Sequence, residues 1–326
     1  MLRRLFPLVA LALAAAPAAL AGGPSPGVAH GGGGVIAPGG GTRYTTVGTS
    51  KQTTVLAVRT KSGLVVRSAT IVGGYGIPTV DFNGSKGGLS ADGSTLVLGD
   101  TAVRSGPYPL KKRSSFAVFA TNPLSLEARV ALKGDFSFDA LSPDGSKLYL
   151  IQHMGGPNLN RYVVRAYDIG AQRLLPGRIA DRTQRGWVMQ GSPVTRATSV
   201  GGRWVYTLYM NPGGFPFVHA LDTVRGEAHC IGIPWKGKQD ALWKWRLSLG
   251  DGGRTLRLDR QSGRTYVAIA TGSWRISHPA ALGSGSFPWW IVGVAGGAAL
   301  LAAAAAALLL RRRRGEGFGP LGWQRA

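Results

Sequence analysis

Apolar and polar residues alternate over short stretches along most of this chain, and the stretches are separated by turns rich in Gly, Asp and Ser. Alternation with a period of two is typical of β-strands that bury one face. Clear strands are predicted at residues 54–58 and 64–71, and a weaker one near 43–47. Apart from one long apolar stretch near the C-terminus, no long helix is predicted, so the body of the chain is expected to be all-β.

One phrase recurs at the strand boundaries. Residues 141–149 read Leu-Ser-Pro-Asp-Gly-Ser-Lys-Leu-Tyr, and residues 89–97 are nearly the same; degraded copies occur at 199–206 and 249–256. The equivalent glycines are Gly93, Gly145, Gly202 and Gly253, at spacings of 52, 57 and 51 residues. Asp tolerates turn geometry and bonds the backbone two residues on, while Gly supplies the positive φ that closes such turns. A period of this length favours repeated four-stranded sheets, as in a β-propeller.

The strands around these turns fall into groups of four. The groups are 86–89, 95–98, 116–120 and 127–132; 136–141, 147–152, 162–167 and 173–179; 194–199, 203–210, 217–221 and 227–231; and 242–248, 255–258 and 266–270. The last group is one strand short, and strands 54–58 and 64–71 are expected to supply the missing outer strand and so close the ring. We therefore predict a β-propeller of about 4–5 four-stranded blades. Five with one shared is preferred, a compact four also fits, and an incomplete ring that relies on a partner is a third option.

The Ser-Pro-Asp-Gly phrase resembles the blade turn of the YVTN/TolB/WD40-like propeller superfamily, over about residues 53–272. The third copy has Gly201-Gly202 in place of Asp-Gly, and no Trp-Asp dipeptide closes a blade, so a typical WD40 protein is not indicated. The resemblance implies an architecture rather than an activity.

The two ends predict a protein anchored in the cell membrane, and the excess of Arg over Lys suits a GC-rich bacterial genome. Residues 1–21 have the basic start, apolar middle and small-residue cleavage site of a signal peptide. Residues 289–310 carry no charge and are followed by four arginines, which is typical of a transmembrane helix with a cytoplasmic C-terminus. The expected divisions are a signal peptide 1–21, a Gly/Pro-rich flexible linker 22–42, a propeller ectodomain 43–278, a juxtamembrane linker 279–288, a transmembrane helix 289–310 and a basic tail 311–326. Gly293 and Gly297 form a weak helix-pairing motif.

Residues that carry chemistry are sparse. The sequence has none of the common nucleophile, zinc, redox or nucleotide motifs, and Cys230 is the single cysteine, within an apolar strand phrase. Its histidines are His30, His153, His219, His229 and His278. They have no carboxylate-rich partner set, and the phrase from Asp81 to Gly84 lacks the further ligands of a calcium loop. We therefore predict no metal and no cofactor.

Positive charge is the most distinctive property, because 38 Lys and Arg face 15 Asp and Glu, for a net charge of +23. In a propeller the loops opposite the Asp-Gly turns share one face, and basic residues fall in those loops together with two tryptophans. The ligand-binding candidates are Arg104, Lys111, Lys112, Arg113, Arg161, Arg182, Arg185, Trp187, Trp235, Lys236 and Lys238, with Arg260 and Arg264 on the same side. Such a face is expected to attract anionic polymers, although a generally basic, solvated surface explains the charge equally well.

The function predicted from the sequence is an extracytoplasmic propeller that binds an anionic envelope polymer or a protein partner. No nucleic-acid fold or motif supports DNA or RNA as the ligand. Two alternatives remain. One is a lactonase- or hydrolase-like enzyme, favoured if His153, His219 or His229 meet acids at the central channel; the other is a structural subunit of an envelope complex, favoured if the ring is open and its free edge apolar.

Overall fold

The computed structural model describes residues 27–29, 33–102, 110–155, 161–181, 183 and 188–278, all within one compact unit, Met1–Pro279. No helix among these residues is both long enough and apolar enough to cross a membrane. The predicted signal peptide, the juxtamembrane linker, the transmembrane helix with Gly293 and Gly297, and the basic tail all lie outside the described residues.

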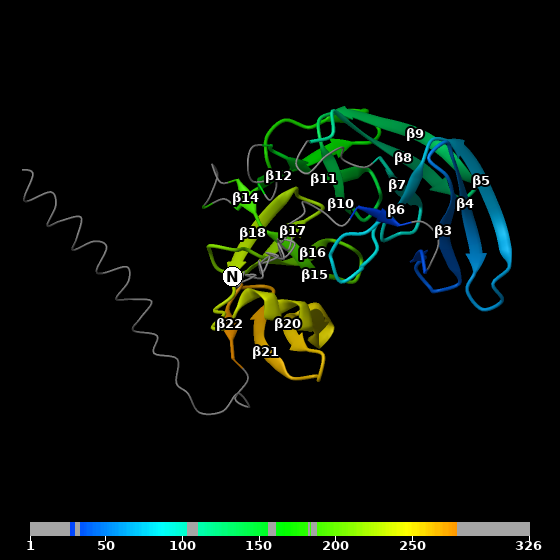
Figure 1. The fold of residues 1–326 in the computed structure, drawn as a ribbon. Coiled ribbons are helices and arrows are strands. Elements are labelled where there is room, and N and C mark those ends of the chain that lie inside the picture. Colours follow the sequence, from blue (N-terminus) through cyan, green and yellow to red (C-terminus); the bar gives the residue numbers. More distant parts are fainter. Residues whose placement is uncertain are drawn as a thin grey trace, which may run out of the picture. The chain divides into compact units, whose positions relative to one another are not determined.

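The described chain folds into five antiparallel sheets of propeller type (Figure 1). The first sheet consists of β2 (Val35–Ile36), β3 (Thr42–Gly48), β4 (Gln52–Arg59) and β5 (Val65–Val72). The second consists of β1 (Val28–Ala29), β6 (Tyr75–Pro78), β7 (Thr95–Asp100), β8 (Arg113–Thr121) and β9 (Leu124–Lys133). The third consists of β10 (Phe136–Leu141), β11 (Lys147–His153), β12 (Arg161–Asp168) and β13 (Arg173–Leu174), with β14 (Met189–Gln190) also paired to β12.

The fourth and fifth sheets repeat the pattern. The fourth consists of β15 (Ser192–Thr198), β16 (Trp204–Met210), β17 (Phe217–Asp222) and β18 (Glu227–Gly232). The fifth consists of β19 (Trp245–Gly250), β20 (Thr255–Arg260), β21 (Thr265–Ala270) and β22 (Ile276–Ser277), and the short 3₁₀ helices η2 (Gln239–Lys244) and η3 (Asp251–Gly253) flank β19. The all-β, propeller-type prediction with about five blades is confirmed.

The Asp-Gly turns at Asp92 and Asp144 are each held by their own serines. The Asp144 carboxylate accepts hydrogen bonds from the Ser142 hydroxyl (2.6 Å) and from the Ser146 backbone N–H (3.0 Å), and the Ser142 hydroxyl accepts from the Lys147 N–H (2.8 Å). The hydrogen bond from Ser142 is the largest of the effects that hold the pKa of Asp144 below its usual value. Gly145 adopts φ 72°, the left-handed conformation in which glycine is favoured. The Ser-x-Asp-Gly-Ser phrase therefore forms the turn by local chemistry alone.

Two predictions about the ends of the repeat are wrong. Strands β4 and β5, predicted to complete the last blade, belong to a sheet of their own, and β22 supplies the last sheet with its own outer strand. The stretch 22–42, predicted to be a flexible linker, contains β1, which pairs with β6, and β2, which pairs with β3. Both strands have only two residues, which is too short for an alternating pattern to reveal them in a Gly/Pro-rich sequence.

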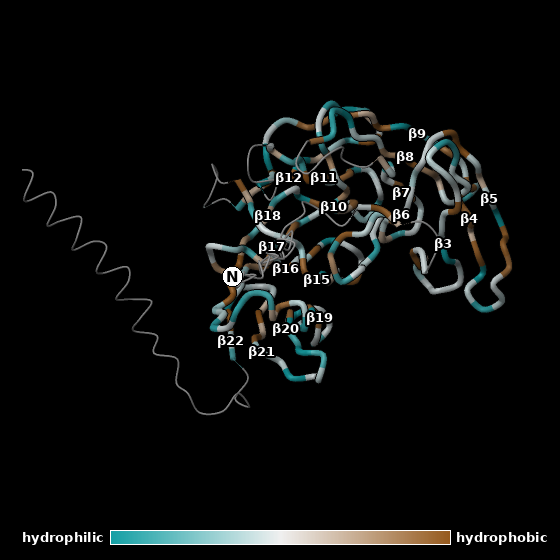
Figure 2. Tube along the Cα trace, in the orientation of Figure 1, coloured by the Kyte–Doolittle hydropathy of each residue, from teal (hydrophilic) through white to brown (hydrophobic). Residues whose placement is uncertain are grey.

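The hydrophobic core is divided among the contacts between consecutive sheets. Figure 2 shows hydrophobic positions recurring along the chain trace of the sheets. One cluster joins the first and second sheets, a second joins the second and third, two join the third and fourth, and one joins the fourth and fifth. No cluster of the described residues joins the fifth sheet to the first. Five sheets in a closed ring would share five such contacts, so the arrangement is an open series and the predicted ring closure by shared strands is not formed.

A loop inserted into the innermost strand of the second sheet crosses the centre of this series. The Phe82 N–H donates to the Pro193 carbonyl (2.9 Å) and the Asn83 N–H donates to the Val194 carbonyl (3.3 Å), both on β15 of the fourth sheet. The Phe82 ring also meets Trp243 of η2 edge-on, with ring centres 5.8 Å apart. The phrase that begins at Asp81 is therefore a turn that ties the second sheet to the fourth.

The turns of the second, third and fourth sheets also meet one another. The Asp92 N–H donates to the Pro143 carbonyl (3.1 Å), and a Cβ placed on Gly202 would lie 2.6 Å from the Cβ of Ala91. Gly202 has φ 75°. The third copy of the turn therefore needs glycine at position 202, because the backbone there is left-handed and because Ala91 leaves no room for a Cβ.

We predict that Gly202→Ala destabilises the fold by about 2–4 kcal/mol, because the left-handed conformation costs about 1–2 kcal/mol and the close contact adds a similar amount. Gly201→Ala is the matched control: Gly201 has φ 80° but nothing lies within 4 Å of its Cβ position. Urea-induced unfolding of both variants measures the difference. Equal losses would show that Gly202 is not held in a tight contact between turns.

Candidate functional site

The acidic residues near the Asp-Gly turns are engaged in holding turns together. Asp222 accepts hydrogen bonds from the Val224 and Arg225 N–H groups (both 3.0 Å) and pairs with Arg203 (2.8 Å). The Arg203 contact and the two N–H groups lower the pKa of Asp222 against the opposing effect of burial. We call the side of the molecule with these turns the turn face, and the opposite ends of the sheets the loop face. Because these carboxylates are committed to the turn face, the loop-face cations have few acids to neutralise them.

An aromatic group lies at the loop-face end of the fifth sheet. The rings of Trp235, Trp245 and Tyr266 are mutually edge-on or steeply inclined, with centres 5.0 to 5.5 Å apart. Trp235 follows the fourth sheet, whereas Trp245 begins β19 and Tyr266 lies near the start of β21. The Tyr266 hydroxyl donates to the Pro234 carbonyl (2.6 Å) and the Trp235 Nε1–H donates to the Lys238 carbonyl (3.2 Å), which fixes the connecting loop against the sheet. All three rings are half-buried, so each leaves part of its surface open.

Exposed cations belong to the same loops. They are Lys236, Lys238, Lys244, Arg260 and Arg264. The Gln261 N–H donates to the Lys244 carbonyl (3.2 Å), and the Arg260 N–H donates to the Arg264 carbonyl (2.8 Å), so the hairpin between β20 and β21 packs beside the loop that carries the lysines. These five cations and the three rings are called the fifth-sheet cluster below.

Two carboxylates lie on these same segments. Asp240 is exposed, whereas Asp259 accepts hydrogen bonds from the hydroxyls of Ser248 and Thr265. Five cations therefore outnumber the nearby acids. Partly open rings beside guanidinium and ammonium groups suit a ligand that has both flat apolar surface and negative charge.

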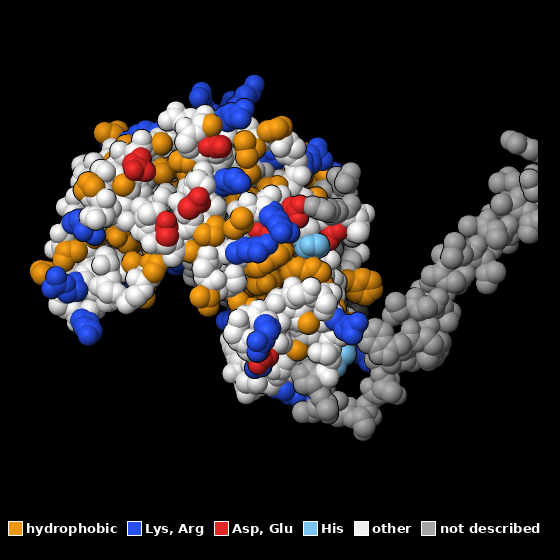
Figure 3. Space-filling model, turned by 180° about the vertical axis from the view of Figure 1, so that it is seen from behind, with side chains coloured by type: hydrophobic (Ala, Val, Ile, Leu, Met, Phe, Trp, Pro, Cys, Tyr) orange, Lys and Arg blue, Asp and Glu red, His pale blue; other side chains and the backbone are white. Residues whose placement is uncertain are grey.

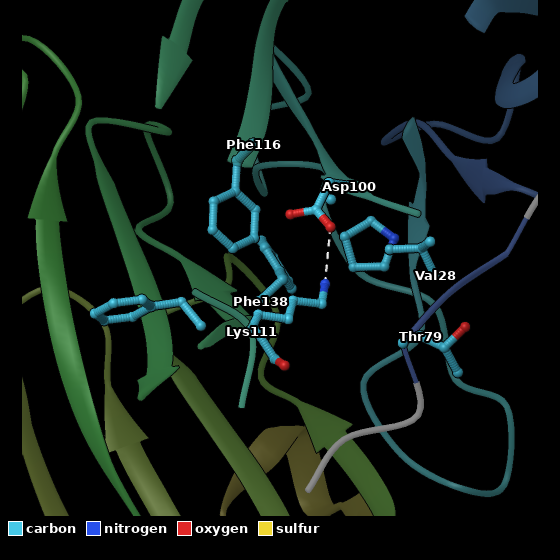
Figure 4. Close-up of a pocket in the computed structure, with 11 residues that line it drawn as sticks. Val28, Thr79, Asp100, Lys111, Phe116 and Phe138 are labelled. Atoms are coloured by element: carbon cyan, nitrogen blue, oxygen red, sulfur yellow. Dashed lines mark hydrogen bonds and ion pairs between the residues drawn. The ribbon is translucent and has the colours of Figure 1, made fainter. Parts of the chain in front are cut away.

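Lys111 does not belong to an open basic surface, contrary to the prediction. Its ammonium pairs with Asp100 at 2.8 Å, and its backbone N–H donates to the Asp135 carboxylate (3.1 Å). Figure 4 shows the Lys111 side chain directed at Asp100 beside Val28, in a cavity about the size of one water molecule, ≈ 30 Å³. The charge of Lys111 is thus neutralised inside the second sheet.

The other predicted candidates are divided between two places and the undescribed stretches. Trp235, Lys236 and Lys238 are in the fifth-sheet cluster, together with Arg260 and Arg264. Lys112, Arg113 and Arg161 are exposed at the loop-face ends of the second and third sheets. Arg104, Arg182, Arg185 and Trp187 lie outside the described residues. Figure 3, which shows one side of the molecule, has basic side chains scattered over the surface rather than gathered in a single patch.

Hydrogen bonds connect these two places along the loop face. Arg161 pairs with Gln190 across β12 and β14, and the Gln190 amide donates to the Asn211 side-chain oxygen (3.2 Å). The Asn211 N–H in turn donates to the Gln239 side-chain oxygen (2.7 Å), one residue beyond Lys238. The loops of the third, fourth and fifth sheets therefore form one connected surface. Lys244, Trp245 and Tyr266 were missed from the sequence because they start strands or end a short helix, and nothing local marks them as surface residues.

The central channel contains a buried ion pair. The Arg196 guanidinium of β15 donates to both the carbonyl and the carboxylate of Asp139 on β10, and its Nε–H donates to the Thr207 hydroxyl (2.9 Å). The two side chains border a cavity of ≈ 210 Å³ between the second, third and fourth sheets. The pair is engaged by its own partners, so it joins two sheets rather than presenting a free charge.

The histidines named for an enzyme site do not meet at this channel. His219 lies buried between the third and fourth sheets, with its Nδ1 3.7 Å from the Cys230 sulfur. His153 is buried beside the Ser137 hydroxyl (3.2 Å), and His229 lies 4.0 Å from Asp181 near the outer strand. None of the three lines the described channel cavities. Burial raises the pKa of Cys230 to about 12, which leaves its thiol protonated and a poor nucleophile.

No set of three or more His, Cys, Asp or Glu side chains among the described residues is placed to hold a metal ion. His30 lies outside those residues, and His278 packs against the Tyr266 ring with centres 6.0 Å apart.

No known protein family and no curated protein matches this chain. Among solved structures, TolB from Acinetobacter baumannii is 15% identical, with 76% of this chain and 53% of that chain covered and a TM-score of 0.41. The chain thus spans about half the length of the TolB chain. The β-propeller domain of Myceliophteria thermophila Cps50 (Swd1) is 10% identical, with 81% and 72% covered and a TM-score of 0.42.

Dihydro-heme d1 dehydrogenase NirN is a third similar structure, 12% identical, with 74% of this chain and 44% of that chain covered and a TM-score of 0.45. At identities and TM-scores this low, no activity of these proteins is transferred to this chain.

The stability of the fold is predicted to fall in acid because of His219. Burial lowers the pKa of His219 from 6.5 to about 4, so below pH 6.5 the unfolded chain binds a proton that the folded chain does not. The stabilising contribution is complete above pH 6.5 and is lost as the pH falls toward 4. Between pH 7.5 and 5 the loss from this residue is about 2 kcal/mol. Urea-induced unfolding at both pH values measures it.

The variant His219→Gln should lose this part of the pH dependence, while His229→Gln, which changes a half-exposed histidine, should keep it. An unchanged pH dependence in His219→Gln would contradict the assignment.

Proposed function

We propose that this protein is an extracytoplasmic, membrane-anchored binding module whose ligand is an anionic polymer of the cell envelope. The fifth-sheet cluster is the proposed binding site. The observation that carries the proposal is the placement of the partly open Trp235, Trp245 and Tyr266 rings among exposed cations on connected loops. The fold by itself supports only the coarser statement that a propeller-type chain can serve as a binding module.

The chemistry of the cluster favours a polymer with rings and charges. Aromatic side chains pack on flat, weakly polar ligand surfaces such as sugar rings. Arginine forks bind carboxylate or phosphate through two parallel hydrogen bonds, and lysines add a field that draws anions to the surface. Acidic polysaccharides and phosphate-containing wall polymers combine both features. Lys112, Arg113 and Arg161 extend the positive surface along the loop face, which suits a chain-like ligand better than a small one.

The proposed location rests on the sequence. The predicted signal peptide and the predicted transmembrane helix with its four following arginines would place the propeller outside the cell membrane. Envelope polymers rich in phosphate or carboxylate are the polyanions expected there. A hydrolase-like activity has less support, because the described histidines do not converge with acids at the channel.

The test is binding of the purified protein to immobilised poly(glycerol phosphate), to a uronic-acid polysaccharide and to neutral dextran, each at several salt concentrations. The double variant Lys238→Glu with Arg260→Glu should weaken binding to the two anionic polymers about ten-fold or more. The reason is that each charge-assisted contact contributes up to about 1.5–3 kcal/mol, with smaller values at exposed sites, and two contacts are lost. Binding should also decline as salt increases. Trp235→Leu should weaken binding to the polysaccharide even at high salt.

The matched control is Arg59→Glu with Lys61→Glu, which makes the same change in charge on the turn face of the first sheet. It should alter binding less than three-fold. Equal losses from the two double variants would mean that net charge alone attracts the polymers. Absence of binding to either anionic polymer at low salt would rule out the proposed ligand.

A further inference from the structure

The first sheet has one face without a neighbouring sheet. Its strand register places Tyr44, Val55 and Ala57 on the face packed against the second sheet. The other face has Ile36, Val47, Leu56 and Val72, together with Arg43, Thr45, Thr54 and Thr70. We call this second surface the end face. In the second, third and fourth sheets, both faces contribute to the core clusters between consecutive sheets.

Several apolar side chains of the end face are unusually exposed, although Val58, which pairs with Arg43, is buried. Ile36 is 60% exposed, Val47 46%, Val65 48% and Val72 78%. β-branched residues on a regular sheet are the kind of surface that blades bury against one another. Their alignment on one face distinguishes them from single apolar residues scattered over a surface.

Polar atoms without partners occur on the same face. The Arg43 Nε is buried and has no hydrogen-bond partner among the described residues, and the same holds for the hydroxyl of Thr45, two positions along the strand. Both atoms are covered by this chain itself, but the Arg43 side chain as a whole is only half-buried, and no ion pair neutralises it among the described residues. The strands that form this face, β2 to β5, contribute no Asp or Glu. A carboxylate from another molecule would therefore meet Arg43 without competition.

The chain itself offers no matching surface at its other end. The open face of the fifth sheet contains Arg246, Ser248, Arg257 and Asp259. The strand register places these four residues on the side of the sheet that faces away from the buried leucines. This face is polar, two of its three charged residues are arginines, and the third, Asp259, is engaged by Ser248 and Thr265, so it does not suit an apolar face centred on Arg43. Two copies stacked end face to end face would bring two Arg43 side chains together with no acid between them. A second copy is thus a poor occupant.

We propose that the end face docks a β-sheet of a different protein, which presents an apolar face with a carboxylate opposite Arg43 and so adds the next blade to the series. This inference is independent of the proposed polymer site, which lies on the fifth sheet. It makes the protein a subunit of an assembly as well as a binding module.

The experiment introduces a photo-crosslinking amino acid into the full chain at Val72 and, separately, at Val47, in the cells that produce the protein. Ser277, exposed on the open face of the fifth sheet, is the matched control position. The expected result is a crosslink from Val72 and Val47, but not from Ser277, to a strand of one other protein close to an Asp or Glu. Arg43→Glu should reduce that crosslink at least ten-fold, and changing the partner's carboxylate to Lys should restore it.

Three results would overturn the inference. A crosslink to another copy of this chain would make the face a self-association surface. A crosslink to the fifth sheet of the same chain would mean that the ring closes on itself. Crosslinking no stronger than that from Ser277, or unaffected by Arg43→Glu, would mean that no partner sheet binds there. Because both label positions are exposed, the labelled proteins should fold normally, and an unchanged thermal unfolding midpoint verifies this.

Discussion

Three turns meet near the axis of this molecule, and their contact determines how closely the second, third and fourth sheets can approach. A serine and an aspartate close the turns at Asp92 and Asp144 locally. In the third turn Ser199 alone accepts from the backbone, and Gly202 leaves space for Ala91 of the neighbouring turn. The buried Arg196–Asp139 pair joins the third and fourth sheets a short distance along the same inner strands. The outer strands follow from the position of the inner ones, because each pairs in register with the strand before it. The loops that carry the fifth-sheet cluster are positioned by this framework.

The same local chemistry also accounts for the charge of the surface. An aspartate that closes a turn with N–H and hydroxyl donors cannot also neutralise an arginine on the other side of a sheet. The chain has few acids, and several of them are engaged in this way. The excess of cations is thus a consequence of how the acids are used as well as of composition. Lys111 shows the exception, since Asp100 lies in the adjacent strand and forms an ion pair with it.

The sequence was informative where structure is local. The turns at Asp92 and Asp144 and most strands of the second to fifth sheets could be predicted, because alternation and turn chemistry are properties of neighbouring residues. The first sheet was misassigned because its inner turn, residues 37–41, is Ala-Pro-Gly-Gly-Gly and lacks the Asp-Gly signature. Trp235, Trp245 and Tyr266 come together only through tertiary packing, so only Trp235 was named beforehand. The pairing of Lys111 with Asp100 likewise depends on strand register, which a linear pattern does not specify.

The loop that reaches from the second sheet to Pro193 and Val194 changes how this molecule should come apart. Arrays in which each repeat touches only its neighbours unfold in stages, from either end. This loop ties the second sheet directly to the fourth, and its Phe82 ring reaches η2 at the entrance to the fifth. The second to fifth sheets are thereby coupled as one cooperative unit, whereas the described contacts of the first sheet are with the second sheet and its inserted loop. The first sheet is therefore the separable part of the array, able to open locally while the rest stays folded.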